Sequence, residues 1–304
     1  DENKTKTGRY RADETILTGL NVPFVNDLFK IFKLKKLQGT YLDGVFRELT
    51  SDGFIHPSYN LNTVETFRSS SGNPNLQNIP IRDPEIGELI RKCFIPRSSD
   101  RVLLEVDYGA LEWKIACCFW QDPKMLSYAH DPTTDIHRDM AARCYKVDPD
   151  LVNKDVRYCA KNGYVFPKIY GSYYLKIAQN MWTMIDDKKL TVGDLPMKKH
   201  LKKQGIKSLG LCDQQVRPRA GTFENHIKKI EDWFEQEFAV LTANKKTWID
   251  DYRKRGWFQM MTGFKIRGIY GANFLLNAPI QGPGFHCLLW SLNQIVLREL
   301  RKYK

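Results

Sequence analysis

The sequence lacks several features that would assign it to a common class. Its seven cysteines include no Cys-x-x-Cys pair, so zinc-ligand spacing is absent. The odd cysteine count favours reduced thiols over a disulfide framework. No apolar run approaches the roughly 20 residues that cross a bilayer. Residues 1–20 are polar and charged, so we expect no secretory signal. These absences favour a cytoplasmic protein that spans no membrane.

Acidic residues are scarce relative to basic ones. The 304 residues carry 47 Lys and Arg against 35 Asp and Glu, a formal charge of +12. This excess predicts a polyanionic partner and says nothing about the fold. Basic residues are spread along most of the chain, with denser runs at 30–36 and 198–207, which suits a charged channel. If the protein neutralised about five phosphates of such a partner, a plot of the logarithm of the binding constant against the logarithm of the salt concentration would have a slope of roughly −4 to −5.

A carboxylate follows the apolar run 102–106. This Val- and Leu-rich run is typical of a buried strand, and helical spacing resumes after Gly109. Asp107, where the strand would end, could hold Mg²⁺ together with substrate phosphates. Alternatively, it caps the next helix. Glu112 adds a second acidic group nearby.

Small, polar and turn-forming residues make up the stretch 66–80, which predicts a loop. Its amide and hydroxyl donors, together with Arg68, could contact sugars, phosphates and minor-groove acceptors. A plain surface loop has the same composition, so both interpretations stay open. Just upstream, residues 53–62 predict a hairpin.

Arg157 and Lys161 are four residues apart, so on a helix they share one face. Two such cations repel unless an anion such as a triphosphate lies between them, although a solvated basic face is the simpler alternative. Phe166 would lie about 140° off this face in a regular α-helix, and Pro167 lacks an N–H for the helical hydrogen bond. A π-bulge would resolve both problems and return Phe166 and Tyr170 to the basic face.

The remaining segments predict helices and one hairpin. A helix begins at Asp135, and a long amphipathic helix runs from Phe223 to Tyr252 with its apolar stripe in the core. Residues 256–264 form a hairpin, and Asn277 starts an apolar helix. The basic stretch 181–222 has the character of an insertion, whose Lys-rich run is either a solvated helix or a DNA contact.

Four motifs together resemble the family A DNA polymerases, the bacterial DNA polymerase I type. Asp-Tyr-Gly-Ala-Leu-Glu-Trp-Lys (107–114) is similar to the first catalytic motif of that family. Pro-Asn-Leu-Gln-Asn-Ile-Pro (74–80) resembles its primer–template loop. The pattern 157–171 resembles its fingers helix, and Asn-Ala-Pro-Ile-Gln-Gly (277–282) resembles a later palm motif. The Lys-Asn-x-x-Val-Phe-Pro form of the fingers helix resembles phage-type members most, which would place the protein in a host cytoplasm.

The resemblance implies an α+β right-hand polymerase fold, with an antiparallel palm sheet, helical fingers and part of a helical thumb. The expected domains are the end of the thumb (1–58), the first part of the palm (59–127), the fingers (128–254, with the insertion at about 181–222) and the second part of the palm (255–304).

The resemblance also implies roles for individual residues. Asp107 would bind metal and act in catalysis together with Arg157 and Lys161. The incoming dNTP would contact Tyr108, Glu112, His137, Arg157, Lys161, Phe166 and Tyr170, with Glu112 excluding ribonucleotides. Primer–template DNA would contact Arg68, Asn75, Asn78, Asn277 and Gln281. The implied reaction is DNA-templated DNA synthesis with two Mg²⁺ ions.

The sequence also departs from the family. The chain stops at Lys304, before the position at which the family has its His-Asp motif, which supplies the second metal-binding Asp. We therefore expect a second polypeptide to provide it and an open apolar face beside residues 102–106. Two other functions stay open: a single-subunit RNA polymerase relative, against which Glu112 argues, and an inactive primer–template-binding protein.

Overall fold

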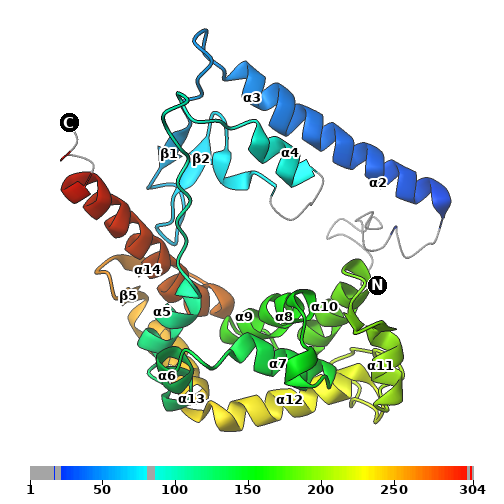
Figure 1. Cartoon of the computed structure of the whole chain (residues 1–304). Coiled ribbons are helices and arrows are strands. Elements are labelled where there is room, and N and C mark those ends of the chain that lie inside the picture. Colours follow the sequence, from blue (N-terminus) through cyan, green and yellow to red (C-terminus); the bar gives the residue numbers. More distant parts are fainter. Residues whose placement is uncertain (1–16, 18–21, 81–85, 300–301, 303–304) are drawn as a thin grey trace. The chain divides into compact units, whose positions relative to one another are not determined.

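A computed structural model describes residues 17, 22–80, 86–299 and 302 (Figure 1). The chain divides into two compact units, Asp1–Val106 and Asp107–Lys304. The predicted polar lead-in at residues 1–20 lies almost wholly outside the described residues. The boundary between the units falls within the predicted first part of the palm, and the assignment to thumb, palm and fingers stays a prediction.

The first unit begins with helices and continues into a small sheet. Helix α2 starts at a proline, whose missing N–H needs no partner there. It passes without a break into the π-helix η1 and then α3. The elements are α2 (Pro23–Lys36), η1 (Leu37–Leu42), α3 (Asp43–Arg47), β1 (Ser58–Asn60), β2 (Ser70–Gly72), η2 (Leu76–Asn78) and α4 (Ile86–Lys92).

Strand pairing in this unit differs from the prediction. Strand β1 pairs antiparallel with β2, with Tyr59 opposite Ser71. The predicted hairpin within residues 53–62 is therefore wrong, because the partner strand lies about ten residues further along the chain. The pairing brackets Arg68 between two short strands.

The prediction of a buried strand at residues 102–106 is also wrong. Val102 and Leu104 are 85% and 83% exposed, and the segment belongs to no strand. An apolar run is buried only where a neighbouring strand or helix covers it, and no described strand pairs with this one. Leu103 and Val106 of the same run are exposed as well.

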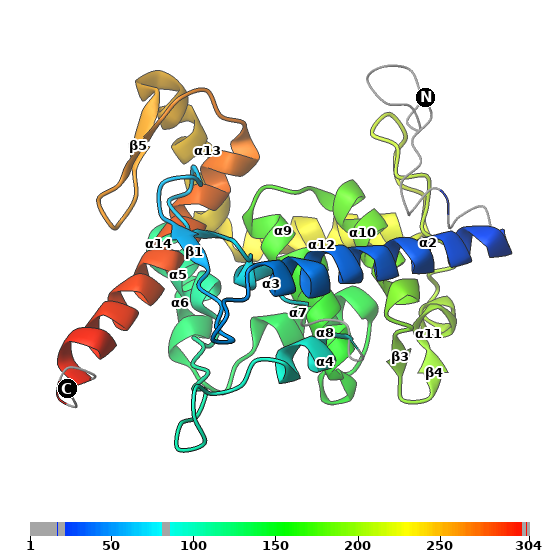
Figure 2. The same cartoon turned by 90° about the horizontal axis from the view of Figure 1, so that it is seen from above.

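The second unit is mostly helical (Figures 1 and 2). Its helices are α5 (Leu111–Trp120), α6 (Pro123–His130), α7 (Ile136–Tyr145), η3 (Pro149–Leu151), α8 (Lys154–Ala160), η4 (Lys161–Val165), α9 (Phe166–Ile169), α10 (Tyr174–Asp187), α11 (Met197–Lys203), α12 (Phe223–Glu237), α13 (Ala239–Arg255), α14 (Ala272–Gln294) and η5 (Ile295–Glu299). Its strands are β3 (Thr191–Val192), β4 (Leu195–Pro196), β5 (Trp257–Gln259) and β6 (Lys265–Arg267), paired β3 with β4 and β5 with β6.

Large apolar side chains from α7, η4 and α12 form the core of this unit. Tyr145, Tyr164, Phe223 and Phe234 are fully buried there, as the predicted stripe of α12 requires. The single helix predicted over 223–252 is instead two helices, because Phe238 leaves helical geometry at φ −106° and ψ 53°. The hairpin predicted at residues 256–264 extends further than predicted, because β5 pairs with β6, and β6 lies beyond residue 264.

Side-chain caps determine where the helices begin. Asp122 caps α6 through its Oδ1, and its Oδ2 accepts a hydrogen bond from the N–H of Leu241 at 2.9 Å. Asp135 caps α7, which confirms the predicted helix start. One carboxylate therefore both starts α6 and holds it against the start of α13.

Helix α14 begins earlier than predicted. It starts at Ala272, five residues before Asn277, and includes Pro279 and Pro283 in its interior. The expectation that Asn277 starts the helix is therefore wrong. Each proline removes one helical hydrogen bond, but both are buried against other parts of the unit, and this packing keeps the helix continuous.

The α+β class is confirmed, although the described strands form three two-stranded sheets and no larger one. All seven cysteines are free thiols. Among the described helices, none has both the length and the apolar character needed to cross a membrane.

Candidate functional site

A π-turn shapes the centre of the candidate site. Helices α8 and α9 are joined by the π-helix η4, in which the N–H of Phe166 bonds to the carbonyl of Lys161, five residues earlier. The wider turn returns Phe166 to the face of Lys161, whose ammonium lies 5.4 Å from the ring centre. The predicted π-bulge is therefore confirmed.

A glycine lets this turn pack against α10. A Cβ at Gly163 would lie 2.7 Å from Cγ of Met181, closer than side-chain contacts allow. The π-turn thus needs a glycine on its buried side, and it presents Lys161 and Phe166 on its outer side.

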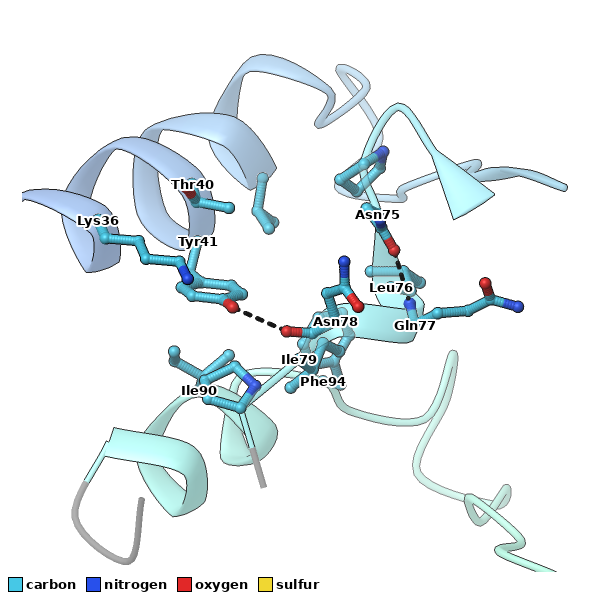
Figure 3. A pocket seen from close by; sticks show the side chains of 13 residues that line it. Lys36, Thr40, Tyr41, Asn75, Leu76, Gln77, Asn78, Ile79, Ile90 and Phe94 are labelled. Carbon is cyan, nitrogen blue, oxygen red and sulfur yellow. Dashed lines mark hydrogen bonds between the residues drawn. The ribbon is translucent and has the colours of Figure 1, made fainter. Parts of the chain in front are cut away.

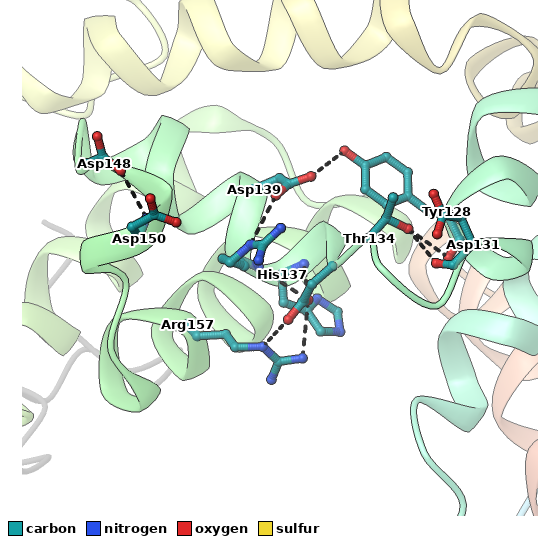
Figure 4. A network of polar contacts seen from close by, with 10 residues as sticks. Tyr128, Asp131, Thr134, His137, Asp139, Asp148, Asp150 and Arg157 are labelled. Atoms are coloured by element: carbon teal, nitrogen blue, oxygen red, sulfur yellow. Dashed lines mark hydrogen bonds and ion pairs between the residues drawn. The ribbon is translucent and has the colours of Figure 1, made fainter.

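Arg157, on α8, is held by a carboxylate from α7 (Figure 4). Its Nε and Nη2 donate to the two oxygens of Asp135 at 2.6 and 3.2 Å. Burial alone would raise the pKa of Asp135. The hydrogen bonds and charge of Arg157, together with the N–H groups of Arg138 and His137, outweigh burial, so the pKa lies below its usual value. The pair leaves the remaining guanidinium N–H groups available while fixing their direction. Sequence reasoning missed this role of Asp135, because a separation of 22 residues carries no local signal.

His137, for which the resemblance implies a contact with the incoming dNTP, is buried. Only 2% of it is exposed, and its ring packs against Trp113 and Phe166 at 6.4 and 5.7 Å between centroids. Burial lowers the pKa of His137 to about 4, and the charge of Arg157 adds to the effect, so the imidazole is neutral at pH 7. Its Nδ1 has no hydrogen-bond partner among the described residues. Contact with a phosphate would require the neighbouring rings to move.

Tyr170 and Glu112 connect this surface to α5. The hydroxyl of Tyr170 donates to Oε2 of Glu112 at 3.1 Å. The Tyr170 ring lies parallel to that of Phe166, at 9° and 6.0 Å between centroids. Residues separated by up to 58 positions thus meet at one place, as the resemblance implies.

Asp107 and Tyr108 lie at the start of the second unit and are exposed. The Tyr108 hydroxyl bonds to that of Ser291 on α14. Asp107 has no hydrogen-bond or ion-pair partner among the described residues, whereas Glu105 pairs with Arg91 at 2.8 Å. A free carboxylate is the right donor for a hard cation such as Mg²⁺.

The residues present fit one such cation better than two. Nowhere in the described part of the chain do three or more His, Cys, Asp or Glu side chains gather as metal ligands would. Asp107 with the phosphates of a bound nucleotide would suffice for one Mg²⁺, because this ion commonly takes one or two carboxylates and keeps the rest of its ligands from substrate and water. Among the described residues, no three-ligand cluster is present that could hold the second ion of the predicted pair.

The predicted DNA contacts on α14 are half-buried. Gln281 and Asn277 lie on successive turns of this helix. Oδ1 of Asn277 is buried without a hydrogen-bond partner among the described residues. An unsatisfied buried oxygen costs roughly 1–3 kcal/mol, which favours a donor from a bound molecule or water at this position.

The other predicted DNA contacts belong to the first unit. Arg68, Asn75 and Asn78 are all exposed there. The stretch 74–80 lines a groove of about 810 Å³ together with η1 and α4 (Figure 3). Across this groove the hydroxyl of Tyr41 donates to the carbonyl of Asn78 at 2.8 Å, and Asn75 caps η2 through the N–H of Gln77.

A buried charge cluster supports α9 from behind, and sequence reasoning missed it too. Lys168, only 8% exposed, pairs with Glu231 at 2.7 Å and Glu235 at 2.6 Å on α12. Lys245 on α13 donates to the carbonyl of Lys168 at 2.6 Å. The two glutamates at i and i+4 face one direction, and that spacing was the available signal. The cluster joins α9, the helix that carries Phe166, to α12 and α13.

The helical second unit, with its cluster of cationic and aromatic side chains around η4, can be compared with known proteins, and one comparison names the family. The model of DNA polymerase family A matches residues 1–190, and the chain belongs to this family.

Known relatives agree with this assignment. The chain is 28% identical over 298 residues to DNA polymerase I of Streptococcus pneumoniae, a match covering 96% of this chain and 30% of that protein. It is 35% identical over 183 residues to DNA polymerase I of Chloroflexus aurantiacus, covering 59% and 19%. The chain therefore spans about a third or less of the length of these relatives.

A solved structure supports the fold. The chain resembles the POL domain of Pol1 from M. smegmatis, solved in complex with DNA primer-template and dNTP, with a TM-score of 0.68 and 24% identity over 97% of this chain and 48% of that one. The predicted polymerase fold is confirmed. The roles of individual residues and the phage-type assignment stay predictions.

Proposed function

We propose that the protein carries out template-directed DNA synthesis, adding dNTPs to the 3′ end of a primer. Membership of DNA polymerase family A supports this proposal. The structural relative from M. smegmatis, which was solved in complex with DNA primer-template and dNTP, supports the choice of partners. In this proposal the second unit binds the nucleotide, and Arg68, Asn75 and Asn78 contact the minor groove of the primer–template.

The arrangement around η4 is the observation that carries the proposal. Arg157 is oriented by Asp135, and Lys161 lies over the same face as Phe166. Two cations directed at a triphosphate would neutralise its charge, while the flat ring of Phe166 would stack on the incoming base. Tyr170 would then lie by the templating base, and Glu112 would occupy the space that a ribose 2′-OH needs.

Asp107 would hold Mg²⁺ in the reaction. The ion supplies charge neutralisation at the phosphates when bound. Asp107 itself contributes an exposed carboxylate one residue before Tyr108, whose hydroxyl is tied to α14. That tie limits the positions open to the carboxylate.

A second carboxylate is required for two ions, and we propose that a polypeptide segment with a His-Asp pair supplies it. In the second unit, α14 leaves the apolar side chains of Leu288, Leu289, Trp290 and Leu292 exposed, and exposed apolar surface is what a partner can cover.

Primer extension tests the proposal. The purified chain is assayed with labelled primer–template, dNTPs and Mg²⁺, with and without a polypeptide that carries the His-Asp hairpin. We expect DNA binding in both cases and extension only with the added polypeptide. Robust extension by the 304-residue chain alone would refute the need for the second segment, and no extension with it would refute the proposed synthesis.

The same assay separates the alternatives. Replacing dNTPs by rNTPs distinguishes a DNA polymerase from a relative of the single-subunit RNA polymerases. An inactive primer–template-binding protein would bind DNA but would not bind dNTP at Arg157 and Lys161, which nucleotide-binding measurements would reveal.

A further inference from the structure

Residues 188–222 form a basic segment that the proposed function leaves without a role. They contain nine Lys and Arg and two Asp, so their net charge is +7, while that of the whole chain is +12. The segment leaves the end of α10, forms the hairpin β3–β4 and helix α11, and returns at α12. In both views α11 lies beside the start of α12, at the far end of that helix from α13 (Figures 1 and 2).

Helix α11 separates its apolar residues from its charged ones. Met197 and Leu201 are fully buried in the core of the unit. Lys199, Lys202 and Lys203 point the other way on a 3.6-residue repeat and are exposed.

The three lysines form a cluster of unneutralised charge. None has an acidic partner within 4.0 Å among the residues that the structure describes. Lys199 repels Lys202 and Lys203 at three and four residues' separation, which destabilises an isolated helix by a few tenths of a kcal/mol per pair. An anion bound across them would remove this repulsion.

The rest of the segment is attached to α12 by its backbone. The N–H groups of Phe223 and Glu224 bond to the carbonyls of Ser208 and Leu209 at 2.8 and 2.9 Å. Gly210 has a positive φ of +110° and packs closely against Glu224. A Cβ on this residue would lie 2.3 Å from the Cδ of Glu224. The N–H of Lys207 bonds to Gly221, which brings this lysine near the second end of the loop. The exposed cations therefore project from a folded, anchored surface.

We infer that this basic surface binds DNA phosphates outside the polymerase site. The partner is a nucleic-acid backbone, because repeated phosphates match a row of exposed lysines without any base-specific group. Within this surface, Lys199, Lys202 and Lys203 make the principal contacts. The inference adds a second DNA contact to the proposed function, yet DNA binding here does not require that the chain synthesise DNA.

The test is a pair of triple variants of the full chain. One carries Lys199→Glu, Lys202→Glu and Lys203→Glu. The matched control carries Lys229→Glu, Lys246→Glu and Lys254→Glu, three exposed lysines of α12 and α13 that likewise have no acidic partner among the described residues. Both variants change the net charge by the same amount, so a difference in their DNA binding must come from where the three lysines lie. Thermal unfolding confirms that each variant folds.

Binding is measured by fluorescence anisotropy over a range of salt, without dNTP or Mg²⁺. Three primer–template probes are used. The first has a blunt end, the second has a long single-stranded template overhang, and the third has a short gap followed by further duplex. We expect the α11 variant to bind extended probes more weakly than the control does, with a salt slope smaller by about 2–3, roughly one unit per lost phosphate contact.

The probes distinguish the two forms of DNA. A loss confined to the overhang assigns the surface to the single-stranded template, and a loss with the gapped duplex assigns it to double-stranded DNA. Either result supports a phosphate-binding surface. Equal binding and equal slopes for both variants on every probe would overturn the inference, and would leave the proposed synthesis untouched because primer extension is measured separately.

Discussion

The segment Lys154–Ile169 and the segment Val102–Tyr108 carry the two halves of the proposed chemistry, and they differ in their surroundings. The first is packed against α7, α10 and α12, and Arg157, Lys161 and Phe166 each have a neighbour that directs them. The second is extended and exposed, and Asp107 has no described partner. Local packing thus pre-organises the proposed nucleotide contacts, whereas no described residue holds the proposed metal ligand Asp107.

The largest expected effect is at the exposed half. Asp107→Asn keeps the shape of the side chain and removes the charge that a cation needs. In the complex that extends primers, we expect the rate to fall by roughly 10³-fold or more, since a bound metal contributes several kcal/mol, while primer–template affinity is retained. Asp194→Asn, at another exposed carboxylate, should leave the rate unchanged. Near-normal turnover of the Asp107 variant would remove the metal assignment.

The packed half should respond in stability. Lys168→Met leaves Glu231 and Glu235 without their buried cation, and breaking such a pair costs about 3–5 kcal/mol. Lys198→Met, which breaks the exposed pair with Asp186, should cost about 1 kcal/mol or less. Denaturant unfolding measures the midpoint of each variant. Equal shifts for Lys168→Met and Lys198→Met would show that the buried charge cluster does not stabilise the protein more than an exposed ion pair does.

The junction between α5 and α9 should control sugar selection. Glu112→Ala opens the space that the carboxylate fills, and we expect the preference for dNTP over rNTP to fall by roughly 10- to 100-fold. Tyr170→Phe removes the hydrogen bond to Glu112 but keeps the carboxylate, so most of the preference should survive. Unchanged discrimination in the alanine variant would make Glu112 a structural residue only.

The buried cluster should also make the stability of the protein depend on pH. Burial lowers the pKa of Lys245 to about 7, with the charge of Lys168 adding to it and Glu235 opposing it. The ordinary value near 10.4 applies when the chain is unfolded. Between these two pH values the unfolded chain binds more protons, so stability should rise with pH.

Two variants test this rise. Thermal unfolding between pH 7 and pH 10 should show it in the parent and in Lys246→Met, at an exposed lysine. Lys245→Met should show less of it, because the titrating group is gone. An identical profile for the Lys245 variant would mean that its ammonium keeps an ordinary pKa in the folded protein.

Local patterns predicted much of the site. The spacing of Arg157, Lys161 and Phe166, with Pro167 beside them, predicted the π-turn, because the hydrogen-bonding limits of one helix are contained in its own residues. The cap at Asp135 and the apolar stripe of α12 were predictable for the same reason. The break at Phe238 and the start of α14 at Ala272 were not, because packing against distant elements decides where a helix ends.

The sequence by itself determined the family, the basic charge and the helical face that carries Arg157 and Lys161. Only the tertiary structure decided that Asp135 orients Arg157, that His137 is buried and neutral, and that Lys168 has two carboxylates. It also decided that the apolar run at Val102–Val106 is exposed. Helical periodicity depends on neighbours within a few residues, whereas burial, ion pairing and strand formation depend on which distant groups reach the same place.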